Sequence, residues 1–257
     1  AMMGAKPLYL TCSFIIEAGF ALADLQRIIQ SMATSASIAN VIIVAGDTKV
    51  VEHGKADGVF ISTSGVGVVT AKHQPSGKNA QVGDVVILSG NLADHGIAVL
   101  AERESLKFES PIQSDCAALN SVVERLCSAL PEGAIKVLRD PTRGGLATTL
   151  NEIAEQSQVG ILLQEQAIPV GVETNAVCEL LGLDPLYIAN EGKFIAIVDQ
   201  QYGELALQTL KSHPLAEQAA IIGEVIEDAQ HFIQMQTKIG GLRMVDWLNG
   251  EPLPRIC

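Results

Sequence analysis

The hydrophobic pattern of the first part of the chain predicts three strands and one helix. Runs rich in apolar residues at 8–16, 41–44 and 59–69 are typical of strands, the second of them of a short buried strand. Between the first two, apolar residues recur at helical spacing from Leu22 to Met32, and Asp24 suits the first turn of that helix. This order is half of an α+β layer, and we expect its sheet to need partner strands from upstream residues or from a second subunit.

A segment at 71–83, which contains Pro75 and Gly77 among polar residues, is the best candidate for a linker. Beyond it, strand-like and helix-like segments alternate, which indicates a second and fuller domain with a layered mixed sheet. Ser114 is the expected N-cap of one of its helices. We expect strands at 85–88, 160–163, 194–198 and 219–226, and helices at 94–104, 114–130, 144–156, 174–181 and 202–211.

The fold class is therefore α+β or α/β, with two domains built on mixed sheets. Residues 1–70 would form the first domain, 71–83 the linker and 84–250 the second domain, followed by a C-terminal arm at 251–257. The chain enters a strand within a few residues of its start. We therefore expect a sequence cut from something longer, with an incomplete first domain.

Composition and charge narrow the class of protein. With 257 residues, 48% hydrophobic and only 4% aromatic, the chain is long enough for aliphatic cores in one large or two modest domains. The net charge of −12 and the absence of a run of Lys and Arg argue against nucleic acid or an anionic membrane as a partner. No apolar stretch approaches the ~20 residues of a membrane span. The five cysteines show no Cys-x-x-Cys pair, which indicates reduced thiols in a cytoplasmic enzyme.

The arm at 251–257 ends the chain with a thiol. Pro252 and Pro254 fix φ and lack backbone donors, so an extended, polyproline-like path suits the arm best. Such an arm would carry Cys257 between two separate sites, and Arg255 would favour the thiolate. The alternative is a frayed terminus whose last residue happens to be cysteine.

Residues 139–145 place Asp140, Thr142 and a pair of glycines, Gly144 and Gly145, directly before a helix. The N–H groups at a helix start and the close approach that glycines permit make an anion site, where Asp140 would hold Mg²⁺ against the phosphates of a nucleotide. The spacing supports equally well the alternative that Asp140 or Thr142 only caps the helix.

Gly46, Asp47, Thr48 and Lys49 follow an apolar run, where a turn would expose side chains at the end of a sheet. Asp47 would bind metal, Thr48 would hydrogen-bond a phosphate, and Lys49 would act as a cation or base. The alternative, a polar hairpin turn, is the commoner meaning of Gly-Asp-Thr.

Residues 190–193, Asn-Glu-Gly-Lys, precede a strand. Glu191 would be a general base if partly buried, with Lys193 as its partner or a phosphate contact, although such a sequence alone is more often a solvated turn. His95 is more often a cap or packing residue and stays outside the catalytic set. Common nucleotide motifs are missing: there is no Walker A pattern, and 65–69 lacks the third glycine of a dinucleotide fingerprint and is interpreted as a tightly packed strand.

Four segments together, 46–50, 139–145, 190–193 and 254–257, closely resemble the HypE family of hydrogenase maturation factors. The resemblance runs along the whole chain. The family belongs to a superfamily of ATP-using enzymes with aminoimidazole ribonucleotide synthetase, thiamine-phosphate kinase and selenophosphate synthetase, and the Pro-Arg-Ile-Cys end is specific to HypE. The resemblance implies a two-domain aminoimidazole-ribonucleotide-synthetase-like fold, and a homodimer in which first-domain strands from two subunits close a barrel.

The resemblance also implies an activity. HypE-like proteins receive a carbamoyl group on the terminal cysteine from the carbamoyltransferase HypF and dehydrate it with ATP to a thiocyanate. The cyanide then passes to iron held by HypC and HypD, for the [NiFe] hydrogenase centre. In this chain Cys257 would carry the group, Glu191 would be the base, and Lys49 would polarise the thiocarboxamide oxygen.

ATP and Mg²⁺ are the cofactors that the resemblance implies. Asp47 and Asp140 would hold Mg²⁺ on the phosphates. The implied nucleotide contacts are Asp47, Thr48, Asp140, Thr142, Gly144 and Gly145. Proteins of this family carry an upstream glycine-rich segment with further acidic ligands, and this chain begins just beyond it. We therefore expect this form to bind ATP weakly or not at all, and to be inactive or compromised in dimer assembly.

Two other functions stay open at this point. A selenophosphate-synthetase-like phosphotransferase would keep the roles of Asp140 and the glycines but would not use the arm. A passive carrier would be modified on Cys257 and recognised by partners without catalysing anything. After carbamoylation, the loss of one water from the tail when ATP is added distinguishes a dehydratase from a carrier.

Overall fold

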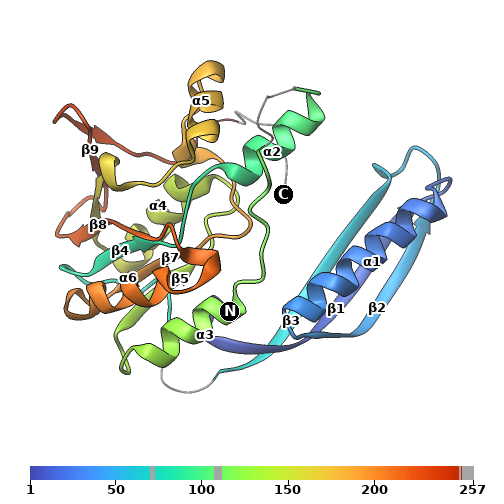
Figure 1. The fold of residues 1–257 in the computed structure, drawn as a ribbon, viewed down its shortest axis with the longest axis horizontal. Coiled ribbons are helices and arrows are strands. Elements are labelled where there is room, and N and C mark those ends of the chain that lie inside the picture. The colour runs from blue at the N-terminus through green and yellow to red at the C-terminus, as the bar shows by residue number, and fades with distance from the viewer. Residues whose placement is uncertain (70–72, 107–111, 249, 251–257) are drawn as a thin grey trace. The chain divides into compact units, whose positions relative to one another are not determined.

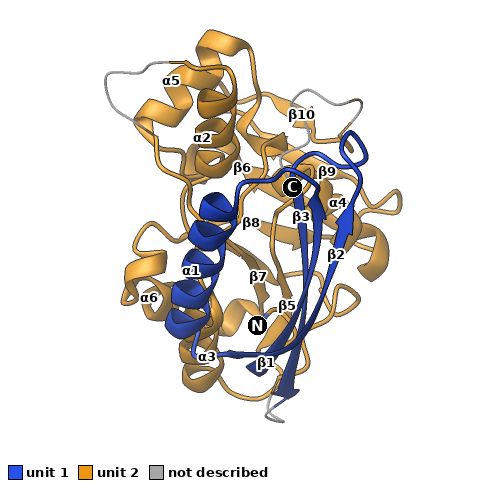
Figure 2. Cartoon of the chain, turned by 90° about the vertical axis from the view of Figure 1, so that its right-hand side faces the viewer, with its two compact units in different colours: residues 1, 5–70 blue, residues 2–4, 71–257 orange. Residues whose placement is uncertain are grey.

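The computed structural model describes residues 1–69, 73–106, 112–248 and 250. The chain divides into two compact units, which Figure 2 colours separately. The smaller unit comprises residue 1 and residues 5–70, and the larger unit comprises residues 2–4 and 71–257. Each unit has its own sheet, and both sheets contain parallel and antiparallel pairs, so the expected α/β class with mixed sheets is confirmed.

The smaller unit is a three-stranded sheet with one helix. Its elements are β1 (Ala5–Glu17), α1 (Leu22–Ile38), β2 (Ile42–Val51) and β3 (Val59–Val69), and the strand order is β2-β1-β3. The central strand β1 pairs in parallel with β2 and antiparallel with β3. All four expected elements are present.

The extent of β2 differs from the expectation. The sequence predicts a short strand at 41–44 followed by a turn at 46–49, whereas β2 continues to Val51 and includes the whole Gly46-to-Lys49 segment. The reason is the length of the neighbouring strand: the ladder between β1 and β2 runs from the Tyr9–Ile42 pair to the Glu17–Val51 pair. A continuous ladder of backbone hydrogen bonds outweighs the local turn preference of Gly-Asp-Thr.

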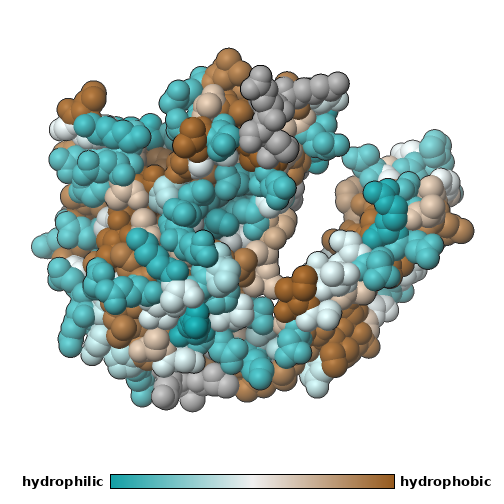
Figure 3. Space-filling view, in the orientation of Figure 1, coloured by the Kyte–Doolittle hydropathy of each residue, from teal (hydrophilic) through white to brown (hydrophobic). Residues whose placement is uncertain are grey.

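The strands of the smaller unit are also exposed where a buried strand was expected. Ile42 and Val44 of β2 are 63% and 56% exposed. Hydrophobic residues accordingly gather on the surface over these strands in Figure 3. Tyr9, Ile15, Phe60 and Val66 are exposed as well, and the pairing of Tyr9 with Val66 and of Ile15 with Phe60 puts them on one face of the sheet.

The larger unit is a seven-stranded mixed sheet with helices packed against it (Figure 1). The strand order is β10-β9-β6-β8-β4-β7-β5, and among the pairs in the described residues β6–β9 is parallel and the others are antiparallel. Its elements are β4 (Val85–Leu88), α2 (Asp94–Arg103), α3 (Asn120–Ala129), β5 (Ile135–Arg139), α4 (Gly145–Ser157), β6 (Gly160–Gln164), α5 (Val172–Leu181), β7 (Ile195–Val198), α6 (Gly203–Lys211), β8 (Ala220–Ile226), β9 (Ile233–Gln236) and β10 (Leu242–Met244). Short 3-10 turns η1 (Glu165–Ala167), η2 (Pro185–Tyr187), η3 (Gln200–Tyr202) and η4 (Pro214–Ala216) join some of them.

The helices of the larger unit pack against the sheet and against one another, as α2 does against α5. Helix α4 contacts β6, β9 and η2, whereas α6 contacts β4, β8 and α3. The fully buried Leu146, Leu150 and Ile153 recur along α4 at helical spacing and join the main apolar cluster with Val86 and Leu88 of β4. Both the apolar stripe on α4 and the buried sheet therefore follow the periodicity of the sequence. None of the described helices combines the length and hydropathy that crossing a bilayer requires.

Three expectations for this unit need correction or addition. Helix α3 begins at Asn120 and not near Ser114, so Ser114 does not cap it. The strands β5, β9 and β10 were not anticipated. The described part of the expected linker, 73–83, packs onto the larger unit, where the side chains of His73 and Ala80 are buried.

Candidate functional site

The loop between β5 and α4 forms an open helix N-terminus. Gly144 and Gly145 both have positive φ, 75° and 64°, and no side chain caps α4. A Cβ on Gly145 would lie 2.5 Å from the carbonyl oxygen of Leu186 and 2.7 Å from that of Ile188, so only glycine fits. The first turn of α4 thus presents backbone donors without a side-chain cap, which suits an anion.

The polar side chains around this helix start are consistent with a ligand site. Asp140 is exposed, and Thr142 is partly buried and uses its carbonyl to accept the Gly145 N–H at 3.0 Å. The Thr148 hydroxyl oxygen is buried and has no hydrogen-bond partner in the described part of the chain. The alternative in which Asp140 or Thr142 caps the helix is wrong, because neither side chain bonds the helix start. An unused buried hydroxyl beside open N–H groups fits a phosphate-bearing ligand.

Asn190 links this loop to two other segments. Its side chain is fully buried, donates to the carbonyls of Pro141 at 3.0 Å and Ile188 at 2.9 Å, and accepts the N–H of Ala93 at 2.8 Å. The interpretation of 190–193 as a solvated turn is therefore wrong. One amide side chain connects the Asp140 loop, the Glu191 loop and the start of α2.

Asp115 holds the backbone around Glu191. Its Oδ1 accepts the Glu191 N–H at 3.0 Å, and its Oδ2 lies 3.5 Å from the ammonium of Lys193. The side chain of Asp115 is 3% exposed and that of Lys193 14%, so this ion pair is well shielded from solvent. A Cβ on Gly192 would lie 1.6 Å from the Asp115 carbonyl oxygen, which makes glycine obligatory between Glu191 and Lys193.

The surroundings of Glu191 suit a general base. Burial raises the pKa of its carboxyl group, Asp115 and Asp140 act in the same direction, and His95 acts against them. Burial likewise raises the pKa of Asp94, which accepts a hydrogen bond from the Thr174 hydroxyl at 2.6 Å. A carboxylate with a raised pKa accepts protons more readily at neutral pH than an ordinary glutamate.

Asp47, Thr48 and Lys49 lie in the smaller unit, on β2. Alternation along the strand puts Asp47 and Lys49 on one face and Thr48 on the other. Asp47 accepts the backbone N–H of Thr48 at 2.8 Å. Asp47 and Thr48 line a pocket of about 410 Å³ between α1 and the sheet, together with Cys12, Phe14, Ile29, Met32, Ala33 and residues 43–46.

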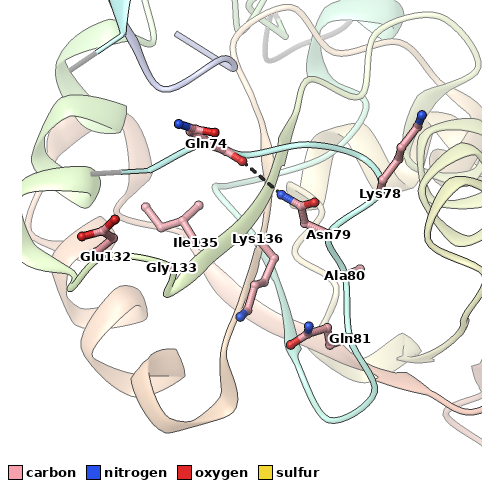
Figure 4. Close-up of a pocket in the computed structure, with 9 residues that line it drawn as sticks. All are labelled: Gln74, Lys78, Asn79, Ala80, Gln81, Glu132, Gly133, Ile135 and Lys136. Atoms are coloured by element: carbon pink, nitrogen blue, oxygen red, sulfur yellow. Dashed lines mark hydrogen bonds between the residues drawn. The ribbon is translucent and has the colours of Figure 1, made fainter. Parts of the chain in front are cut away.

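A second pocket, of about 640 Å³, lies in the larger unit, and Figure 4 shows the residues that line it. Lys78 and Lys136 contribute cations and Glu132 a carboxylate, and Asn79 donates to the Gln74 carbonyl at 3.0 Å. None of the residues predicted from sequence lines this pocket. It is therefore not the candidate site.

The expected roles of Cys257 and of the metal ligands can be compared with the described residues. Cys257 lies outside the described residues. Within the described residues no three or more His, Cys, Asp or Glu side chains group together as a metal site. Asp47 and Asp140, the two expected metal ligands, belong to different units.

The structure adds residues that the sequence did not indicate. The sequence gives no signal for Asp115 and predicts His95 as a cap or packing residue, whereas Asp115 bonds the Glu191 N–H and His95 acts on the pKa of Glu191. Their contacts connect segments far apart in the chain, as in the Asp115–Glu191 bond, which spans 76 residues. No local spacing signals such a contact.

The whole chain matches known proteins. Residues 1–69 match the N-terminal domain, and residues 81–236 the C-terminal domain, of the AIR synthase related protein family. The carbamoyl dehydratase HypE of Cupriavidus necator is 59% identical over 257 residues, which are 100% of this chain and 73% of that protein. The HypE of Azotobacter vinelandii is 56% identical over 257 residues, 100% of this chain and 75% of that protein.

Solved structures agree with this. A hydrogenase maturation protein HypE in complex with ATP has a TM-score of 0.94 at 46% identity, over 100% of this chain and 77% of that chain. A HypE–HypF complex has a TM-score of 0.93 at 49% identity, over 96% of this chain and 80% of that chain. The described fold is thus the fold of these proteins.

Proposed function

The chain belongs to the AIR synthase related family and, within it, to the HypE carbamoyl dehydratases, and we propose that it uses ATP to dehydrate an S-carbamoyl group on Cys257 to a thiocyanate. The role of the family is hydrogenase maturation, and the thiocyanate would supply the cyanide ligands of the [NiFe] centre. One observation carries the proposal: an uncapped helix N-terminus at Gly144 and a partly buried Glu191 are held to each other through Asn190.

The reaction makes two demands that these residues meet. In becoming R–S–C≡N, the group R–S–C(=O)–NH₂ loses its oxygen and two protons from nitrogen. ATP, when bound, supplies the phosphoryl group that turns the oxygen into a leaving group. Glu191 would remove a nitrogen proton, and Lys49 would neutralise charge that develops on the oxygen.

The helix start would hold the nucleotide. The backbone donors at Gly144 and Gly145, with Thr142 beside them, would bind phosphate oxygens, and Asp140 would hold Mg²⁺ on the same phosphates. In the smaller unit, Asp47 is the candidate carboxylate ligand for a metal and Thr48 the candidate hydroxyl contact for a phosphate. The solved complex of a similar HypE protein with ATP supports a nucleotide in this fold.

Partners follow from the same chemistry. A HypF-type carbamoyltransferase would load Cys257, a contact that the HypE–HypF complex of a similar protein supports. A HypC–HypD complex would receive the cyanide. A homodimer through the smaller unit would cover the exposed apolar face that contains Tyr9, Ile15, Phe60 and Val66. We place the reaction in the cytoplasm.

Mass spectrometry of the tail tests this proposal. In the full-length enzyme carbamoylated by a HypF-type carbamoyltransferase, Mg-ATP should lower the mass of the C-terminal peptide by one water. Cys257→Ser should neither accept the carbamoyl group nor support the mass change. An unchanged mass in the carbamoylated wild-type protein would identify a passive carrier and overturn the proposal.

A further inference from the structure

His95 is a buried imidazole with an unused nitrogen beside the base. It is 8% exposed, and its Nε2 is buried without a hydrogen-bond partner among the described residues. Its other nitrogen, Nδ1, lies 2.9 Å from the Ser114 hydroxyl and 3.6 Å from the Cys116 sulfur. A buried polar atom without a partner in a native fold calls for an explanation, and one such explanation is a catalytic role.

The backbone fixes His95 next to Glu191 from two directions. Ala93 and Gly96, on either side of His95, donate to the Asn190 side chain at 2.8 Å and to the Ala189 carbonyl at 3.2 Å. The consecutive residues Ser114 and Asp115 contact His95 and the Glu191 N–H respectively. Two independent sets of contacts therefore hold the segments that carry His95 and Glu191 next to each other.

The proposed dehydration creates a need for a second proton acceptor. One carboxylate takes one proton, but two protons leave the same nitrogen. We propose that His95 Nε2 receives the first proton from Glu191, so that Glu191 is a carboxylate again when the second proton leaves. This inference rests on the proposed function and assigns His95 a role through Glu191, without contact to the substrate.

The proton balance closes within these groups. The first proton moves from nitrogen to Glu191 and then to Nε2, which gives an imidazolium; the second stays on Glu191 until product release, and the oxygen leaves with the phosphate. The relay uses the tautomer with its proton on Nδ1, donated to Ser114. Besides His95, the charged groups that act on Glu191 are Asp115 and Asp140, and both raise its pKa.

The test compares His95 with a matched histidine in the carbamoylated full-length enzyme. His73 is 4% exposed, its Nε2 lies 2.9 Å from the Cys127 carbonyl, and its Nδ1 is likewise buried without a partner in the described part of the chain. His95→Ala should slow the loss of water about 100-fold, a typical contribution of a proton-transfer group. Its affinity for Mg-ATP by calorimetry should stay unchanged, and His73→Ala should retain the wild-type rate.

Chemical rescue separates a relay from a structural role. Free imidazole should restore a substantial part of the rate of His95→Ala and none of the rate of Glu191→Gln. Ser114→Ala leaves the ring in place but removes the partner of Nδ1, so it should slow the reaction on the order of tenfold and keep the fold. A wild-type rate in His95→Ala, or a slow variant that imidazole does not rescue, overturns the relay. If the wild-type protein loses no water with ATP, the proposed function itself fails.

Discussion

Asp115 accepts the backbone N–H of Glu191 at 3.0 Å, while the other oxygen of its carboxylate lies 3.5 Å from the ammonium of Lys193. One buried side chain thus holds the backbone N–H of the residue that we assign as the base and pairs with the side chain two residues later. Glu191 is placed by a carboxylate 76 residues earlier in the chain.

Asp115→Ala should reduce the rate of tail dehydration by about 10- to 100-fold, because the Glu191 N–H and the Lys193 ammonium both lose a buried partner. Asp115→Asn should lose less, since the amide oxygen still accepts the Glu191 N–H. The rate is read from the mass of the tail in the full-length enzyme.

A control for this pair is Asp199→Ala, which removes an aspartate that accepts the Gln201 N–H at 2.9 Å. This variant loses one hydrogen bond from a backbone N–H elsewhere in the larger unit, and its dehydration rate should be unchanged. Equal losses in Asp115→Ala and Asp199→Ala would mean that Asp115 contributes only to stability.

The rate should depend on pH through Glu191. The base acts as a carboxylate, and burial raises its pKa, so the rate should fall as the pH drops through a value above the ~4.3 of an ordinary glutamate. Because Asp115 contributes to the upward shift, Asp115→Asn should move the falling limb to lower pH. A limb at the same pH in Glu191→Gln would exclude Glu191 as its origin.

Gly145→Ala should destabilise the larger unit far more than Gly182→Ala. Both glycines have positive φ, 64° and 67°, so each alanine incurs about 1 kcal/mol of backbone strain. A Cβ on Gly145 also meets the Leu186 carbonyl oxygen at 2.5 Å, whereas nothing lies within 4 Å of one on Gly182. Urea unfolding should show an additional loss of about 2 kcal/mol for Gly145→Ala. Equal unfolding free energies would contradict the close contact.

Asp140→Asn should weaken the binding of Mg-ATP at least about tenfold, since a neutral amide is a poorer ligand for Mg²⁺ than a carboxylate. Calorimetry on the full-length enzyme measures this. Asp228→Asn, whose parent side chain accepts the Gln230 N–H at 2.7 Å, is the matched control and should bind as the wild type does. An unchanged affinity in Asp140→Asn would remove Asp140 from the metal site.

The paired change Phe60→Ser and Val66→Ser should weaken the proposed dimer of the full-length protein at least about tenfold, because each side chain would bury apolar area in it. Phe60 is 53% and Val66 61% exposed in the single chain. Sedimentation gives the dissociation constant. Val172→Ser with Ile239→Ser, two residues of the larger unit that are 82% and 96% exposed, should leave it unchanged.

Much of the fold is readable from the sequence because the apolar periodicity is strong. The strand at 59–69 has the bounds that the pattern predicts, and helix α2 starts at Asp94 as predicted. The failures lie where distant contacts outweigh local preference. Gly46 to Lys49 form part of a strand because β1 pairs with them, and residues near Ser114 stay out of a helix because His95 and Glu191 hold them.

The sequence predicts only those parts of the candidate site whose residues are close together in the chain. A glycine pair before a helix signals an anion site, and this expectation fits the uncapped start of α4. The roles of Asp115 and His95 depend on bonds to residues 76 and 19 positions away, which no spacing rule contains. The sequence does not predict the burial of Asn190 for the same reason, because two of its three partners, Ala93 and Pro141, are distant in the chain.

The three hydrogen bonds of Asn190 fix the position of the phosphate-binding loop relative to the loop that carries Glu191. The loop that would bind phosphates and the loop that would accept protons are both hydrogen-bonded to the Asn190 side chain, so neither moves independently of the other. The distance between the two loops is therefore fixed when the chain folds. Nucleotide binding energy is not needed to bring Glu191 into position. In this sense the phosphate loop and the base of the larger unit are preorganised before the nucleotide and the sulfur-bound group bind.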